Sequence, residues 1–313
     1  MSVEAYDDDE FPTCVVHILP IKTAEINPVF VWIPGNPGIL EYYQEMLINL
    51  HEKHPTWEIL AISHIGMNTK TTSLFKGSHQ DNSRVFTLKE QIQHKIKIIN
   101  NFVKDSNVPI YISGHSVGAY MVQKIVASDE LIGQVLKMGL ITPTIIDIHL
   151  SEKGKSMTRY ARWSCRQLPH ILSFLCYIVF GWLVPGILRS YIIGYVMGCH
   201  HDSQAAISTE LFLTGPNFVR QSLGLAQEEM DTIHDDWQFQ AELIEYCLKN
   251  SIKIQFLFSA TDHWVREATR KEIIQFYQER CKGAKALLKI DVSDQFPHSF
   301  VVRRSKYVVE HYF

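Results

Sequence analysis

The pentapeptide Gly-His-Ser-Val-Gly at residues 114–118 sets a serine between two glycines, which is the G-x-S-x-G spacing of a hydrolytic nucleophile. By itself the spacing is weak, because a chain of this length contains it by chance roughly once in ten to twenty cases. Here a strand-like apolar run precedes it and a helix-like run follows, as a nucleophile elbow requires. Gly114 and Gly118 keep side chains out of the turn. We therefore predict Ser116 as the nucleophile, in an elbow with Gly114, His115 and Gly118, over a merely structural glycine turn.

A serine hydroxyl becomes a nucleophile when a histidine takes its proton, and a carboxylate orients that histidine. In sites of this kind the groups follow in the chain order serine, acid, histidine. Asp262 and His298 each come just after a predicted strand, in that order. Asp147 also follows a predicted strand and is a competing acid. We predict a triad of Ser116, Asp262 and His298.

Acyl transfer also needs N–H donors aimed at the oxyanion of the tetrahedral intermediate. The loop Pro-Gly-Asn-Pro-Gly at residues 34–38 follows the apolar run at 29–33, where such a site obtains one donor. Pro37 has no N–H, so the backbone amide of Asn36 is the candidate, together with that of Val117 beside the nucleophile. An ordinary proline and glycine loop is the alternative.

The elements that must position these residues follow from short apolar runs that alternate with helical patterns. Nearly continuous apolarity is typical of strands covered on both faces. Strand and helix alternation predicts an α/β fold with a doubly wound, mainly parallel sheet, whose carboxyl edge collects active-site loops. Helices are expected at residues 88–105, 237–249 and 266–279. Strands are expected at residues 14–19, 29–33, 58–63, 109–113, 135–142, 254–259 and 287–292.

The alternation stops between the fifth and sixth of these strands, which predicts an insertion. We expect an N-terminal core part at residues 1–143, a helical cap at 144–236 and a C-terminal core part at 237–313. The cap contains a hydrophobic segment at about 168–198.

Within that segment, residues 171–188 carry no charge, a length near the minimum for a membrane span. Gly181, Pro185 and Gly186 would break a straight helix, so we favour a helix-break-helix hairpin lying in one leaflet. A buried core helix is the alternative. Five basic residues upstream are spaced so that several share a helical face that could meet anionic headgroups: Lys153, Lys155, Arg159, Arg162 and Arg166.

The 313 residues are 46% hydrophobic and 20% charged, enough to bury a large core, and the net charge of −3 gives no general attraction to nucleic acid. The six cysteines form no C-x-x-C pair, which argues against a zinc site or disulfide framework.

The acidic start shows no signal-peptide pattern, so we expect a location on the cytosolic side. His200, His201 and Asp202 have no further ligand at standard spacing, and we predict neither a metal nor a cofactor.

The segments VWIPGNPG, GHSVG, SATDHW and FPHSF, with the apolar stretch before the acid, resemble the lipid droplet-associated hydrolases, an α/β-hydrolase family, over nearly the whole chain. The resemblance implies a serine hydrolase on lipid droplets and endoplasmic reticulum, acting on sterol esters or acylglycerols. It also implies Ser116 as nucleophile, Asp262 as acid and His298 as base. Pro34 departs from the wider fold, where many relatives carry a histidine before the glycine.

The expected function is hydrolysis of lipid esters through an acyl-enzyme, at the cytosolic surface of a droplet or of the endoplasmic reticulum. Protein partners are not indicated by the sequence. If an alcohol takes the acyl group in place of water, the same site is an acyltransferase. The sequence is also compatible with a droplet-surface protein that binds or remodels lipid with little turnover, and with a soluble esterase that has a hydrophobic cap.

Overall fold

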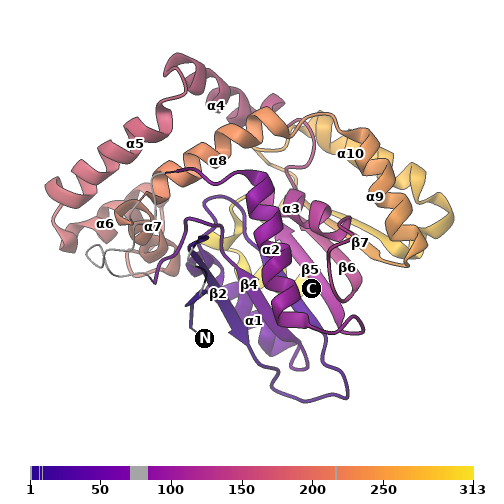
Figure 1. Ribbon diagram of the computed structural model, residues 1–313. Helices are drawn as coiled ribbons and strands as arrows, with labels where there is room; N and C mark the ends of the chain where they lie inside the picture. Colours follow the sequence, from indigo (N-terminus) through magenta and orange to yellow (C-terminus); the bar gives the residue numbers. More distant parts are fainter. Residues whose placement is uncertain (1, 7, 9, 71–83, 216) are drawn as a thin grey trace.

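The computed structural model describes residues 2–6, 8, 10–70, 84–215 and 217–313. An eight-stranded sheet forms the centre of the molecule, in the order β1-β2-β4-β3-β5-β6-β7-β8 (Figure 1). β2 pairs antiparallel with β1 and β4, and all other neighbours are parallel. The predicted α/β fold is confirmed. The strands are β1 (Glu4–Tyr6), β2 (Thr13–Ile18), β3 (Val29–Ile33), β4 (Glu58–Ile62), β5 (Pro109–His115), β6 (Gln134–Ile141), β7 (Lys253–Ser259) and β8 (Leu288–Ser293).

Seven of these strands lie within two residues of their predicted bounds. The sequence pattern missed β1, because its three residues are partly exposed at the sheet edge and form no apolar run. β3 lies at the centre of the sheet and is buried at all five positions, as expected for a strand covered on both faces.

Helices cover both faces of the sheet. On one face, α2 (Leu88–Val103), α3 (Val117–Val126), α9 (Trp237–Lys249) and α10 (Glu267–Arg280) enclose the larger core cluster, and on the other α1 (Gln44–Lys53) and α11 (Ser305–Tyr312) enclose the smaller one. The helices predicted at 88–105, 237–249 and 266–279 correspond to α2, α9 and α10. Short helical turns occur as η1 (Leu40–Tyr43), η2 (Ile148–Leu150), η4 (Lys282–Leu287) and η5 (Phe300–Val302).

Between β6 and α9, the described part of the chain contains helices and no strand. α8 crosses above the sheet, α4 and α5 pack on α8, and α5 and α6 extend to one side of the molecule (Figure 1). These helices are α4 (Glu152–Trp163), α5 (Leu168–Cys176), η3 (Tyr177–Leu183), α6 (Gly186–Met197), α7 (Gln204–Thr214) and α8 (Phe218–Thr232).

The apolar segment of the cap is largely exposed. α5 continues directly into η3, and the helix breaks at Val184 and Pro185 before α6. Among the described helices, none has the length and apolar character needed to cross a membrane. The segment α5–η3–α6 instead presents an apolar surface, named here the hairpin surface, which includes Phe174 (63% exposed), Trp182 (77%), Leu183 (70%), Ile187 (79%), Tyr195 (89%) and Val196 (76%).

Candidate active site

Ser116 occupies the sharp turn between β5 and α3. Its backbone has φ 56° and ψ −124°, a region that non-glycine residues rarely adopt and that marks strain at functional sites. Glycines make the turn possible: a Cβ on Gly114 would overlap the backbone of Gly118, and a Cβ on Gly118 would overlap the carbonyl groups of Ile33 and Pro34. The turn therefore has the geometry of a nucleophile elbow.

His298 lies between Ser116 and Asp262. Its Nε2 atom is 2.9 Å from Oγ of Ser116, and its Nδ1 atom is 2.8 Å from Oδ2 of Asp262. A carboxylate only accepts, so Nδ1 carries the proton and Nε2 is free to accept one from the serine hydroxyl. The structure thus brings together the three predicted triad residues, from loops that follow β5, β7 and β8.

The carboxylate of Asp262 is buried and held by hydrogen bonds on both oxygens. Its side chain is 1% exposed, and its second oxygen accepts hydrogen bonds from the backbone N–H groups of Trp264 (2.7 Å) and Val265 (3.1 Å). With both oxygens engaged, the carboxylate can orient the His298 ring and stabilise its protonated form.

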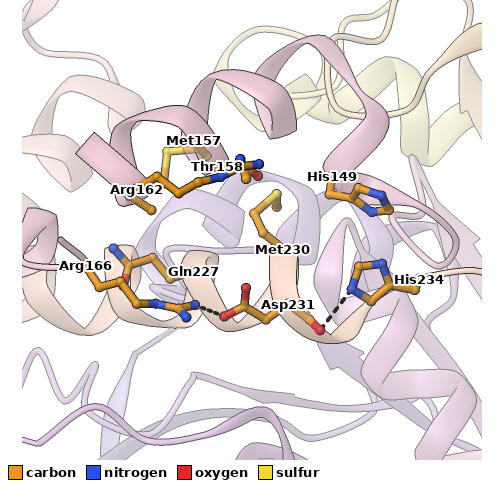
Figure 2. Close-up of a pocket in the computed structure, with 10 residues that line it drawn as sticks. His149, Met157, Thr158, Arg162, Arg166, Gln227, Met230, Asp231 and His234 are labelled. Carbon is orange, nitrogen blue, oxygen red and sulfur yellow. Dashed lines mark hydrogen bonds and ion pairs between the residues drawn. The ribbon is translucent and has the colours of Figure 1, made fainter. Parts of the chain in front are cut away.

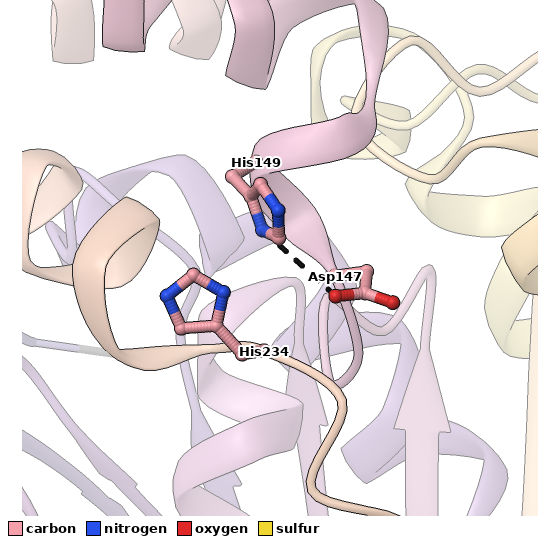
Figure 3. A group of neighbouring side chains, drawn as sticks. All are labelled: Asp147, His149 and His234. Atoms are coloured by element: carbon pink, nitrogen blue, oxygen red, sulfur yellow. Dashed lines mark ion pairs between the residues drawn. The ribbon is translucent and has the colours of Figure 1, made fainter.

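Asp147, the competing acid, lies elsewhere. Its Oδ1 atom is 3.9 Å from Nδ1 of His149, and His234 completes a group whose ligand-type atoms lie within 4.8 Å of one another (Figure 3). His263, next to Asp262, pairs with Glu152 at 2.7 Å on the surface. The geometry therefore favours Asp262 over Asp147 as the triad acid.

Two groups in the described chain have the residue types of metal ligands: Asp147 with His149 and His234, and His200 with His201 and Asp202. Both lie at least partly exposed, where such groups are common without an ion. We assign neither group a metal.

Asn36 lies in the loop after β3 and is held by the cap. Its Nδ2 donates to the carbonyl of Ser222 (2.8 Å) and to Oε1 of Glu229 (2.9 Å), and its Oδ1 accepts from Oγ of Ser222 (2.6 Å). The side chain is therefore engaged with α8, which leaves the backbone amide as the group that can serve an oxyanion. Val117 supplies the first N–H of α3, next to the nucleophile. The oxyanion-hole role of both amides stays a prediction.

Glu229 is a site residue that the sequence pattern does not reveal. It lies on α8 with 4% exposure, and burial raises its pKa to about 7. The signal in the sequence is weak: Glu228 and Glu229 stand together in a helical run, and nothing in the pattern shows which of them faces Asn36.

A cavity of about 350 Å³ lies between cap and core and is lined by Ser116 and His298. Asn36 and Pro37 line it from the core, and apolar side chains line it on several sides: Met157, Leu223, Ala226, Trp264, Val301 and Val302. A mostly apolar cavity with a few convergent polar groups suits a small substrate group with an apolar chain.

A second cavity of about 410 Å³ lies between α4 and α8 (Figure 2). His149 and His234 line one end, and Arg166 at the other forms an ion pair with Asp231. Ser116 does not line this cavity, although Met157 lines both this cavity and the one that contains Ser116.

Comparison with known proteins identifies the family of this chain. The family model described as lipid-droplet associated hydrolase matches residues 26–301. The chain is 25% identical to the lipid droplet-associated hydrolase of Drosophila melanogaster, over 91% of this chain and 87% of that protein. It is 24% identical to the lipid droplet-associated hydrolase of Gallus gallus, over 78% and 73%. The thioesterase domain from the curacin biosynthetic pathway shares the fold, with a TM-score of 0.60 at 11% identity over 99% and 98% of the two chains. This chain therefore belongs to the lipid-droplet associated hydrolase family and is a hydrolase of the α/β-hydrolase fold.

Proposed function

We propose that the protein is a serine esterase that cleaves lipid esters, of the sterol ester or acylglycerol type, at the surface of lipid droplets. The observation that carries the proposal is the hydrogen-bonded series from Ser116 through His298 to Asp262, at 2.9 and 2.8 Å. Ser116, His298 and Asn36 line the same cavity, which supports their proposed roles as nucleophile, base and oxyanion donor.

The proposed reaction uses the side chains of Ser116, His298 and Asp262 and two backbone amides. Nε2 of His298 takes the proton of Ser116 as Oγ attacks the ester carbonyl, and the amides of Asn36 and Val117 stabilise the oxyanion. His298 gives that proton to the leaving alcohol as the C–O bond breaks, which leaves an acyl group on Ser116. Water, deprotonated by His298, attacks this acyl-enzyme and releases the carboxylic acid and the free serine.

The hairpin surface supports a location on lipid. Large exposed apolar side chains that are concentrated on one segment of the chain are typical of a membrane or partner contact. The basic residues Lys153, Lys155 and Arg159 on the adjoining α4 can meet anionic headgroups, each residue adding about 1 kcal/mol near a charged surface. We propose that the hairpin lies in one leaflet, as monotopic association with the cytosolic face of the droplet or of the endoplasmic reticulum.

Labelling with a fluorophosphonate tests the proposal. The wild type, incubated with droplets or mixed micelles, should label, and both Ser116→Ala and His298→Ala should not, because the first lacks the nucleophile and the second its base. The unlabelled wild type should also release fatty acid from acylglycerol or sterol ester emulsions. A folded wild type that neither labels nor hydrolyses any ester would contradict the proposal and favour a lipid-binding role.

A further inference from the structure

A second set of buried hydrogen bonds lies next to the triad, and both of its side chains line the same cavity as Ser116. Oη of Tyr43 is 2.7 Å from Nδ1 of His115, and Nε2 of His115 is 2.9 Å from the backbone oxygen of His298. The backbone N–H of Gly35 donates to the same Tyr43 hydroxyl at 2.9 Å. Tyr43 is 3% exposed and His115 6% exposed, so solvent does not compete for these bonds.

The direction of each bond follows from its end groups. The carbonyl of His298 only accepts, so Nε2 of His115 carries the proton and donates it. Burial lowers the pKa of His115 to about 3, so the ring is neutral and its Nδ1 is an acceptor. The Tyr43 hydroxyl accepts from Gly35 and therefore donates to His115. Every donor in this set thus meets an acceptor.

These bonds join three separate parts of the site. Gly35 precedes Asn36 in the oxyanion loop, His115 precedes the nucleophile, and the His298 carbonyl belongs to the backbone of the catalytic base. The parts are also in tight contact, because a Cβ on Gly35 would lie 2.9 Å from Nδ1 of His115 and 3.0 Å from Cβ of Ser116. A shift of His115 would therefore move the oxyanion loop and the base relative to the nucleophile.

We propose that Tyr43 and His115 are positioning residues, which hold the Gly35–Asn36 loop and the His298 backbone in register with Ser116. The inference rests on the proposed function, since it assigns a role within that reaction. Neither residue touches the reacting atoms through these bonds. They affect how accurately the base and the oxyanion loop are placed relative to Ser116, and a displacement of about 1 Å can reduce the rate on the order of a hundredfold.

The first test is Tyr43→Phe, which keeps the ring and removes the hydroxyl that joins Gly35 to His115. With a soluble short-chain ester, kcat should fall about tenfold or more while KM changes by less than about twofold, and the fluorophosphonate labelling rate should fall in parallel. The matched control is Tyr312→Phe. Its hydroxyl is also buried, accepting from the N–H of Leu140 (3.1 Å) and donating to the carbonyl of Gln255 (2.7 Å), and none of these bonds involves the triad.

The second test compares two amide substitutions of His115, in order to separate a positioning role of its side chain from a packing role. In His115→Gln the side-chain NH₂ can reach the place of Nε2 and still donate to the His298 carbonyl, whereas in His115→Asn the shorter side chain cannot. His115→Gln should therefore keep about tenfold more of kcat than His115→Asn, with both variants melting within a few degrees of each other.

The outcomes distinguish the two proposals. If the wild type labels and turns over ester, but Tyr43→Phe loses no more kcat than Tyr312→Phe and His115→Gln is no better than His115→Asn, the positioning role is wrong and the esterase proposal stands. If the folded wild type neither labels nor turns over any ester, both are wrong.

Discussion

At the scale of single residues, Asp262 and Asp147 differ in whether the carboxylate contacts the histidine that lies beside Ser116. Both follow strands of the same sheet edge, but only Asp262 contacts the ring of His298, and it also accepts from two backbone N–H groups. The carboxylate of Asp147 lies 3.9 Å from the ring of His149.

Replacing each acid by its amide tests this assignment. In Asp262→Asn the remaining oxygen can keep the backbone N–H bonds, so the new NH₂ group faces Nδ1 of His298 and favours the wrong tautomer. The kcat should then fall about a thousandfold or more. Asp147→Asn should change kcat by less than about twofold. The measurement is steady-state turnover of a soluble ester, with melting temperature to confirm folding. A larger loss in Asp147→Asn than in Asp262→Asn would reverse the assignment.

At the scale of elements, one buried carboxyl on α8 links the cap to the loop that contains Asn36. Glu229 accepts from Nδ2 of Asn36, and burial raises its pKa from 4.5 to about 7. The folded protein thus holds the Glu229 proton more tightly than the unfolded chain does. Protonation of Glu229 therefore contributes to the free energy of unfolding. This contribution is fully present below about pH 4.5 and is lost as the pH rises to about 7.

Glu229→Gln should remove this pH dependence, because the amide stays neutral and its oxygen can still accept from Asn36. The free energy of unfolding of the variant relative to the wild type should therefore increase by about 2 kcal/mol between about pH 5 and about pH 7.5. Urea unfolding at both pH values measures it. Glu272→Gln, at an exposed position on α10, is the control. A relative stability that stays constant with pH would contradict the prediction.

The hairpin α5–η3–α6 is the element that we expect to bind the droplet. Trp182→Ser, Leu183→Ser and Ile187→Ser together remove apolar side chains that are 70–79% exposed, so the fold should survive with little change in melting temperature. Flotation with droplets should then fall about tenfold or more, since each fully buried apolar side chain contributes about 1.5–3 kcal/mol to transfer from water.

A matched triple variant lies outside the cap. Leu19→Ser, Ile21→Ser and Ile26→Ser change side chains that are 55–67% exposed in the loop between β2 and β3. This variant should float with droplets as the wild type does. Equal flotation of the two variants would show that the hairpin surface is not the anchor.

At the scale of the whole molecule, the sequence predicts well what depends on local pattern. Each of the predicted strands is a short apolar run, and the three residues predicted as a triad follow strand ends, so their place at one edge of the sheet could be predicted from the sequence. Contacts between distant segments could not. Tyr43 and His115 are 72 residues apart, and Asn36 and Glu229 are 193 apart, and no periodicity specifies such pairs. The short edge strand β1 has too few residues to form a pattern.

The arrangement of cap and core predicts that the cap binds the droplet surface while the reaction takes place in the cavity at the core. The cavity that holds Ser116 is lined on one side by residues of α4 and α8, and the hairpin surface begins on α5, which packs on α8. We therefore expect the cap to deliver substrate from a droplet, whereas a soluble ester reaches the cavity from water. The triple variant of Trp182, Leu183 and Ile187 should lose about tenfold more activity on emulsified long-chain esters than on a soluble short-chain ester. Ser116→Ala should lose both activities and still float with droplets. If the triple variant lost both activities equally while remaining folded, the hairpin would be required for the chemistry itself and not for delivery.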